Sequence, residues 1–212
     1  MAKSAEKIHG AGRTAILDAA EELFAQSGFD GVALRMVAQH ADVALSLVTY
    51  HFPSKEQLID AVITRRSGPV VTARRKALHA FIREDSRDLT RFVEAFTKPF
   101  VDLIGSSDQG WRNFGEIVAQ TTHSTKYGPA FTKHFDHTAR MYAETLADMY
   151  GQEDPQLAIK AILYCASVML GSFAATRRLE AISEGRYDSP GPNDDYPLMV
   201  QFIAAGIERI MG

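Results

Sequence analysis

The sequence is poor in cysteine, because Cys165 is the single cysteine among 212 residues. One cysteine cannot form a disulfide within its own chain, and it cannot supply the several thiolates of a cysteine-built zinc site. The sequence therefore excludes a small fold held together by internal disulfides, and it excludes a zinc finger or zinc ribbon.

Long apolar runs are also missing. A helix needs about 20 consecutive apolar residues to span a bilayer, and no such run occurs. The start of the chain, MAKSAEKIHGAGR, is polar and lacks the basic and then apolar pattern of a leader. A hydrophobic content of 46% is still enough to bury a core. We therefore expect a cytoplasmic protein without a membrane partner.

The common catalytic motifs are absent as well. The sequence has no glycine-rich phosphate loop, no G-x-S-x-G and no H-E-x-x-H. His134 and His137 are three residues apart, so two imidazoles would share a helix face, but an ordinary solvated pair is the simpler interpretation. Nothing near Cys165 indicates an activated thiolate. We expect no enzymatic activity, no cofactor and no metal site.

A basic N-terminal region is the last feature that the chain lacks. Residues 1–66 contain seven Lys or Arg and eight Asp or Glu, so their formal net charge is 7 − 8 = −1. Domains that bind nucleic acid are often basic, and net charge alone therefore argues against DNA. Only the local placement of charges within a motif can decide the question.

Residues 33–52 have the pattern of two short helices joined by a tight turn. The first helix is expected over 34–41, and the second ends in VTYHF at 48–52. Two helices that cross steeply need a small residue at the crossing, here Ala38, and apolar residues around it. The chain reverses at Asp42, where a positive φ is expected because aspartate adopts it at modest cost. The pattern predicts a helix-turn-helix.

The flanking segments support this prediction. Ile16, Ala20 and Phe24 recur at helical spacing, so residues 13–27 form an amphipathic helix that Gly28 is well placed to end. Ser54 and Gln57 have the spacing of a capping box, which predicts a helix that starts at Lys55 and runs through Val62. The acids near the motif belong to the first helix, whereas Arg35, His51 and Lys55 flank the second short helix.

Residues 13–62, RTAILDAAEELFAQSGFDGVALRMVAQHADVALSLVTYHFPSKEQLIDAV, resemble the N-terminal domain of the tetracycline-repressor (TetR) family. The most specific part of the resemblance is YHFPSKE at 50–56, and the whole covers about a quarter of the chain. It implies a domain that binds operator DNA as a homodimer, followed by a divergent helical domain that binds a small effector. Two residues depart from the family pattern: Asp42 replaces a usual glycine, and Ala33 replaces a Thr or Ser that caps the second helix and touches phosphate.

The second short helix would then enter the major groove of double-stranded operator DNA. Its outward positions carry no Arg, Asn or Gln, so we expect bases to be read through apolar and hydroxyl contacts, with Tyr50, His51 and Lys55 on the DNA backbone. The alternative is that Tyr50 and His51 pack the turn and that Lys55 is merely solvated. The predicted DNA-binding residues are Arg35, Leu45, Ser46, Leu47, Thr49, Tyr50, His51 and Lys55.

The rest of the chain has helical periodicity and no lasting strand pattern. Helices are expected at 69–84, 87–105, 109–123, 129–150, 155–184 and 197–211. We therefore predict an all-α protein with a three-helix helix-turn-helix domain at 10–68 and a helical bundle at 69–212 for effector binding and dimerisation.

Two of these helices are candidates for the homodimer interface. Residues 155–184 are apolar on more than one side and rich in small residues, and residues 129–150 would complete an antiparallel pair. Such a pair can dock on its symmetry mate as a four-helix interface. The alternative is that both helices are central in one subunit, and the family resemblance favours dimerisation.

The bundle also contains more aromatic residues than a core of this size needs, which indicates a small-molecule site. The alternative is an ordinary aromatic core. The predicted effector residues are Phe92, Phe96, Phe100, Trp111, Asn113, Phe114, His123, Cys165 and Met169. The sequence thus predicts a repressor released by a small effector, and the competing hypothesis is an all-helical ligand-binding or catalytic domain that does not bind DNA.

Overall fold

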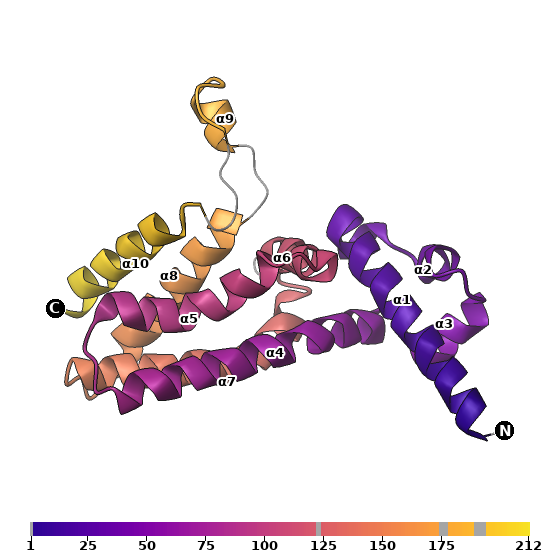
Figure 1. Cartoon of the computed structure of the whole chain (residues 1–212), viewed down its shortest axis with the longest axis horizontal. Helices are drawn as coiled ribbons and strands as arrows, with labels where there is room; N and C mark the ends of the chain where they lie inside the picture. The colour runs from indigo at the N-terminus through magenta and orange to yellow at the C-terminus, as the bar shows by residue number, and fades with distance from the viewer. Residues whose placement is uncertain (1, 122–123, 174–177, 189–193) are drawn as a thin grey trace. The chain divides into compact units, whose positions relative to one another are not determined.

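The structure is a computed structural model that describes residues 2–121, 124–173, 178–188 and 194–212. Within these residues every regular element is an α-helix (Figure 1), which confirms the predicted all-α class. The helices are α1 (Ala2–Gly31), α2 (Leu34–His40), α3 (Leu45–His51), α4 (Lys55–Arg83), α5 (Leu89–Ile104), α6 (Gln109–Thr121), α7 (Gly128–Met149), α8 (Gln156–Phe173), α9 (Arg178–Ile182) and α10 (Tyr196–Met211).

The helices pack into two compact units. The first unit comprises residues 1–66 and 108–131, and the second comprises residues 67–107 and 132–212. Helices α4 and α7 contribute residues to both units. The first unit therefore contains α6, although α6 follows residues 67–107 of the second unit in sequence. The expected division into domains at residues 68 and 69 stays a prediction.

Helix α1 is longer than the predicted 13–27 and begins at Ala2. Gly28 interrupts it with φ 66° and ψ 169°, after which the chain resumes a helical path to Gly31. A positive φ is easy for glycine and costly for residues with a Cβ, so the prediction that the helix breaks at Gly28 is confirmed.

The core of the first unit lies under α1. Ile16, Ala20 and Phe24 are fully buried on one face of α1, as their spacing predicts, and Val37 of α2 and Val48 of α3 are also fully buried. Helix α1 packs against both short helices. Burial of these apolar side chains holds α2 and α3 in a fixed relation to α1.

Helix α4 corrects one prediction. We expected separate helices from Lys55 through Val62 and over 69–84, but α4 is continuous over Lys55–Arg83 with Pro69 inside it. Buried residues recur along one face at Ile63, Val70 and Leu78. A proline inside a helix costs about 3 kcal/mol, and the packing of this continuous face outweighs that cost. The predicted start at Lys55 is confirmed, since Ser54 Oγ accepts a hydrogen bond from the Gln57 backbone N–H at 3.2 Å.

The second unit is built on the buried face of α5. The Asp88 side chain caps this helix by accepting hydrogen bonds from the backbone N–H groups of Thr90 and Arg91. Phe92 and Phe96 are buried on α5, and both rings meet the ring of Tyr142 on α7, at centroid distances of 5.6 and 5.0 Å. These edge contacts join α5 to α7.

Helices α8 and α10 complete the second unit, where α10 packs against both α5 and α8 (Figure 1). The helix predicted over 155–184 corresponds to α8 and α9, and residues 174–177 lie outside the described residues. In the part of the chain that the structure describes, no helix is long and apolar enough to cross a membrane.

Candidate functional site

The helix-turn-helix pattern is confirmed in the first unit. Asp42 has φ 51°, so the chain reverses through the left-handed region at the predicted residue. The backbone N–H of Val43 donates to the carbonyl of Ala38 at 3.0 Å, which closes the turn. Ala38 is only 5% exposed, as expected for the small residue at the crossing of the two helices.

Ala33 lies just before α2 in an extended conformation, with φ −102° and ψ 152°. Its methyl side chain has no acceptor, and its own N–H instead lies 3.5 Å from Met36 Sδ. The side-chain cap that Thr or Ser gives at this position is thus absent, which agrees with the departure noted in the sequence.

Helix α3 presents most of its predicted reading positions outward. Leu45, Ser46 and Thr49 are exposed, and Tyr50 has 70% of its surface exposed. The Thr49 hydroxyl donates back to its own helix, with the carbonyls of Leu45 and Ser46 both at 3.2 Å. The hydroxyl is therefore engaged locally, and the Thr49 methyl group is the free part of that side chain.

Leu47 differs from the prediction of an outward position. It is half-buried, and its Cδ2 lies 3.1 Å from the point that a Cβ on Gly12 would occupy. Leu47 therefore packs closely on α1, at a place where a larger residue than glycine would push it away. Contact of Leu47 with DNA stays a prediction, but its packing role was missed because it depends on the approach of α1.

The other predicted DNA contacts surround α3. His51 is half-buried, with its ring 5.2 Å from that of Tyr50, and Arg35 on α2 is exposed. Lys55 stands at the first turn of α4, where helix N-terminal N–H groups favour anions. The Arg13 guanidinium lies 5.3 Å from the centre of the Phe52 ring, which brings one more cation to this end of α3. The assignment of these side chains to DNA stays a prediction.

A buried ion pair joins α1 to α4 in the first unit, and no pattern in the sequence predicted it. Glu21 on α1 and Arg66 on α4 are 2% and 9% exposed. Arg66 Nε and Nη2 donate to the two Glu21 carboxylate oxygens at 2.6 and 2.8 Å, and Nη1 donates to Asp108 at 3.2 Å. Hydrogen bonding to Glu21 raises the pKa of Arg66 above its usual value. Two residues 45 positions apart give no periodic signal that would have revealed this pair.

Trp111 belongs to the same cluster. Its ring lies 4.9 Å from the Arg66 guanidinium, within the range of a cation–π contact. Phe114 packs on Trp111 with a centroid distance of 6.0 Å, and Asn113 accepts a hydrogen bond from Gln109 on its own helix. These three predicted effector residues all lie in the first unit. His123, the fourth predicted residue of this region, lies outside the described residues.

The remaining predicted effector residues lie in the second unit and are all buried: Phe92, Phe96, Phe100, Cys165 and Met169. Burial raises the pKa of the Cys165 thiol to about 12, so the thiol is neutral at physiological pH. The nine predicted residues thus divide between two units, and their role in effector binding stays a prediction. Among the described residues, no group of three or more His, Cys, Asp or Glu is arranged to hold a metal ion.

Arg74 on α4 is the buried charged residue that the sequence analysis overlooked in the second unit. It is 5% exposed and lies on the buried face of α4 between Val70 and Leu78. A charge at a position where the helical spacing requires an apolar residue is the signal that would have identified it.

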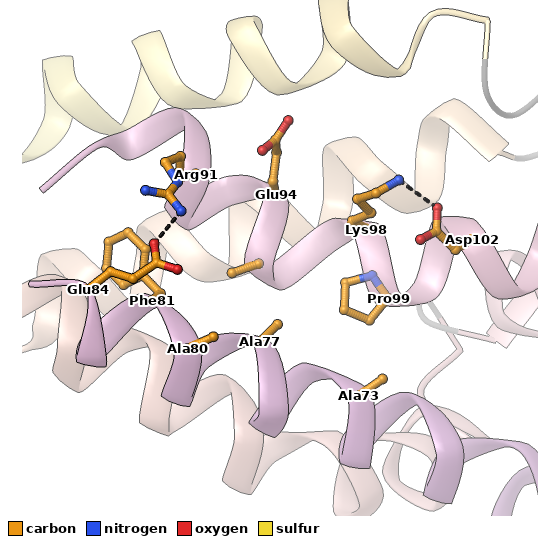
Figure 2. Close-up of a pocket in the computed structure, with 11 residues that line it drawn as sticks. Ala73, Ala77, Ala80, Phe81, Glu84, Arg91, Glu94, Lys98, Pro99 and Asp102 are labelled. Atoms are coloured by element: carbon orange, nitrogen blue, oxygen red, sulfur yellow. Dashed lines mark hydrogen bonds and ion pairs between the residues drawn. The ribbon is translucent and has the colours of Figure 1, made fainter. Parts of the chain in front are cut away.

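A surface groove of about 430 Å³ runs between α4 and α5 in the second unit. Figure 2 shows its alanine wall on α4, formed by Ala73, Ala77 and Ala80, opposite the charged residues of α5. The two α5 cations of the groove are paired: Arg91 binds Glu84, which follows α4, and Lys98 binds Asp102 at 2.8 Å. The cations of the groove are therefore already paired, and Glu94 adds a further carboxylate to its lining.

Comparisons with known proteins agree with this geometry. Two family models match the chain. The model described as "Bacterial regulatory proteins, tetR family" matches residues 16–62, and the model described as "Tetracyclin repressor-like, C-terminal domain" matches residues 94–206. The HTH-type transcriptional regulator UidR of Escherichia coli is 37% identical over 174 residues, which are 82% of this chain and 67% of UidR.

Solved structures share the fold at low sequence identity. The transcriptional regulator FadR from Bacillus subtilis, in complex with stearoyl-CoA, matches with a TM-score of 0.60 at 13% identity over 94% of this chain and 98% of FadR. The multidrug binding protein EbrR, complexed with malachite green, matches with a TM-score of 0.56 at 18% identity over 94% of this chain and 98% of EbrR. With its helix-turn-helix and its helical second unit, the chain belongs to the tetR family of bacterial transcription regulators.

Proposed function

We propose that this chain is a homodimeric repressor that reads a palindromic operator with α3 and leaves it when a small effector binds the second unit. One observation carries the DNA part: α3 turns Leu45 and Tyr50 outward while its Val48 is fully buried. In this proposal the protein acts by binding DNA and the effector, without a catalytic step. Because bacterial operator DNA lies in the cytoplasm, we propose the same location for the protein.

The surface of α3 supports a division between base contacts and phosphate contacts. The Thr49 hydroxyl is engaged by its own helix, so its methyl group and the exposed Leu45 are suited to thymine methyls. Tyr50 and Lys55 are suited to phosphates on either side of the groove, as are the first N–H groups of α4. Phosphate contacts would set the position of the helix, and the apolar contacts would select the bases.

Structural neighbours support the proposal that the protein binds a small effector. FadR was solved with stearoyl-CoA and EbrR with malachite green, so proteins with this fold bind ligands of very different chemistry. In this chain the aromatic side chains of α5 and Cys165 and Met169 of α8 are buried apolar groups of the kind that surround ligands in small-molecule sites. We propose that the effector binds among them.

The exposed apolar residues of the second unit favour α8 and α10 as the dimer interface. Leu163 and Tyr164 on α8 are 57% and 58% exposed, and Leu198 and Phe202 on α10 are 65% and 68% exposed. The two helices pack against each other, so a two-fold axis beside them would create a four-helix interface. The outer face of α7 instead exposes charged residues: Lys133, Asp136, Arg140 and Glu144. We therefore propose α10, in place of the predicted helix over 129–150, as the partner of α8.

The test of DNA reading is selection of random DNA duplexes by the full-length protein, followed by sequencing. A palindrome is expected, with half-sites about one DNA turn apart (34–36 Å) or a multiple of it, because the dimer is symmetric. Failure to enrich any sequence would contradict the proposal.

Binding of the selected duplex then separates the two kinds of contact. Lys55→Ala should lower the magnitude of the salt slope by about one unit for every operator variant, since one phosphate contact is lost. Leu45→Ala should change the preferred bases instead. Lys76→Ala is the matched control, because Lys76 is an exposed lysine of α4 in the second unit. A wild-type salt slope in the Lys55→Ala protein would show that the proposed docking is wrong.

A further inference from the structure

Arg74 is buried in the second unit without a carboxylate partner among the described residues. Its Nε donates to the Phe96 carbonyl at 2.8 Å, and Nη2 lies 3.8 Å from Met169 Sδ. Its guanidinium lies 4.1 Å from the centre of the Phe96 ring and 5.9 Å from that of Phe135. The cation is therefore surrounded by apolar and aromatic groups from α5, α7 and α8.

These contacts satisfy the guanidinium only in part. It has five N–H donors, of which one meets a carbonyl and one meets a weak sulfur acceptor. Desolvation by burial lowers the pKa of Arg74 to about 10, so the group is still protonated at physiological pH. A protonated guanidinium that lacks a nearby anion destabilises the protein that contains it. Packing alone does not explain why an arginine occupies this position.

The groups next to Arg74 do not supply the missing negative charge. Burial keeps the Cys165 thiol neutral, and burial raises the pKa of the Tyr142 hydroxyl above its usual value. The Tyr142 hydroxyl lies 2.9 Å from the Arg74 carbonyl and 2.6 Å from the Ala95 carbonyl, and it donates its proton to them. Tyr142 thus positions the backbone of α4 and α5 and leaves the guanidinium uncompensated.

A second buried polar group, on the face of α7 turned toward Arg74, lacks a hydrogen-bond partner among the described residues. Thr138 on α7 is 1% exposed, and its Oγ1 makes no hydrogen bond within the described structure. Phe135 lies three residues before Thr138 and Tyr142 lies four residues after it, so the three side chains share one face of α7. Since Phe135 and Tyr142 both contact Arg74, this face of α7 is turned toward Arg74.

We propose that Arg74 and Thr138 bind the negatively charged group of an organic anion, and that this anion is the effector. Its apolar body lies against Phe96, Phe135 and Met169. The inference rests on the proposed function and specifies its ligand class. A guanidinium binds a carboxylate or a phosphate with two parallel hydrogen bonds, and the Thr138 hydroxyl adds a third donor. Carboxylates and phosphate monoesters are the two sources of such an oxyanion.

The test compares matched acids and amides on the full-length protein bound to its selected operator. The probes are 4-phenylbutyrate, decanoate and phenyl phosphate, with the neutral 4-phenylbutyramide and decanamide as controls. At least one anion should raise the melting temperature and release the operator, and an active carboxylate should act at a concentration at least tenfold below its amide. Carboxylates and phenyl phosphate report separately on the two sources. Equal effects of acid and amide, or no effect of any anion, would overturn the inference.

Variants connect the effect to the two residues. Arg74→Gln should weaken the active anion at least tenfold, Arg74→Lys should weaken it less, and Thr138→Val should weaken it a few-fold. Arg91→Gln is the control, because Arg91 is an exposed arginine that pairs with Glu84. An anion affinity equal to that of the wild type in a folded Arg74→Gln protein would overturn the inference. If Arg74→Gln does not fold, the affinities of Arg74→Lys and Thr138→Val are measured instead, and wild-type affinity in both would overturn the inference. Arg91→Gln should keep wild-type operator binding without ligand, whereas absence of operator binding in the wild type would refute the proposed function instead.

Discussion

Each of the two units buries an arginine, but the two arginines have different partners. In the first unit Arg66 meets both oxygens of Glu21, an oxygen of Asp108 and the face of Trp111. In the second unit Arg74 meets one backbone carbonyl, one sulfur and two aromatic rings. The first cation is compensated within the protein, and the second is not.

This difference distinguishes an arginine that stabilises the fold from an arginine that is available to bind a ligand. A buried ion pair with good hydrogen bonds holds its elements together, and removal of one partner is costly because the other charge remains. Arg66 therefore joins α1, the helix that supports α2 and α3, to α4 within the first unit. The contacts of Arg74 with aromatic rings and one carbonyl include no anion to offset the cost of burying its charge, so a ligand that supplies the anion explains its presence.

Apart from the loss of Arg66 itself, the largest effect is expected from Glu21→Gln, which leaves Arg66 without its main counter-ion. The free energy of unfolding should fall by about 3 kcal/mol, the lower end of what is typical when a buried pair is broken. Chemical denaturation at fixed protein concentration measures it. The neighbouring Glu22 is only half-buried, and it meets His40 and Gln26 at the surface, so Glu22→Gln should cost less than about 1 kcal/mol. Similar losses for both variants would mean that the buried pair is not structural.

The same cluster predicts a steric effect at Gly110. A Cβ at this position would lie 1.8 Å from Arg66 Nη2, so Gly110→Ala must displace the guanidinium from its partners. We expect a loss of about 2 kcal/mol, as for overpacking of a core. Gly68 on α4 has no atom within 4 Å of its Cβ position, and Gly68→Ala should stabilise the helix by about 1 kcal/mol. Thermal unfolding of the two variants should therefore shift in opposite directions, and a shift in the same direction would contradict this account of the cluster.

In the second unit a smaller effect is expected at Tyr142, which is fully buried. Tyr142→Phe removes the hydroxyl that binds the carbonyls of Arg74 and Ala95, at a cost of about 1 kcal/mol. The exposed Tyr187 supplies the control, since Tyr187→Phe should have no measurable effect. A loss above about 3 kcal/mol for Tyr142→Phe would indicate that the surroundings of Arg74 are built for stability, as those of Arg66 are.

The smallest effect is expected in the backbone of the turn. Asp42 has φ 51°, which glycine adopts at lower cost, so Asp42→Gly should raise the free energy of unfolding by about 0.5 kcal/mol. Asp42→Ala should lower it by about 1 kcal/mol, because alanine has no polar side chain to support this conformation. A destabilised glycine variant would show that the Asp42 side chain contributes more than its backbone costs.

Local features of the fold were predictable because they depend on neighbours in sequence. The break at Gly28, the turn at Asp42 and the start of α4 after Ser54 all follow from one residue and its local hydrogen bonds. The outward position of Tyr50 follows from the spacing of Val48 and the apolar residues before it.

Features that depend on distant partners were not predictable in the same way. The packing of Leu47 depends on Gly12, and the pair of Glu21 with Arg66 depends on how α1 meets α4. The continuity of α4 through Pro69 depends on a tertiary packing face that outweighs a local penalty. The predicted effector residues were assembled from composition alone, which cannot tell which aromatic residues share a unit.

The most direct test of the contrast between the two arginines is the free energy of unfolding of Arg66→Met and Arg74→Met, measured without ligand at one protein concentration. Arg66→Met should lose about 3–5 kcal/mol, because it leaves Glu21 buried without its cation. Arg74→Met should stay within about 1 kcal/mol of the wild type or exceed it, because an apolar side chain of similar length replaces an uncompensated charge. A loss for Arg74→Met as large as that for Arg66→Met would contradict the account and make Arg74 a structural residue.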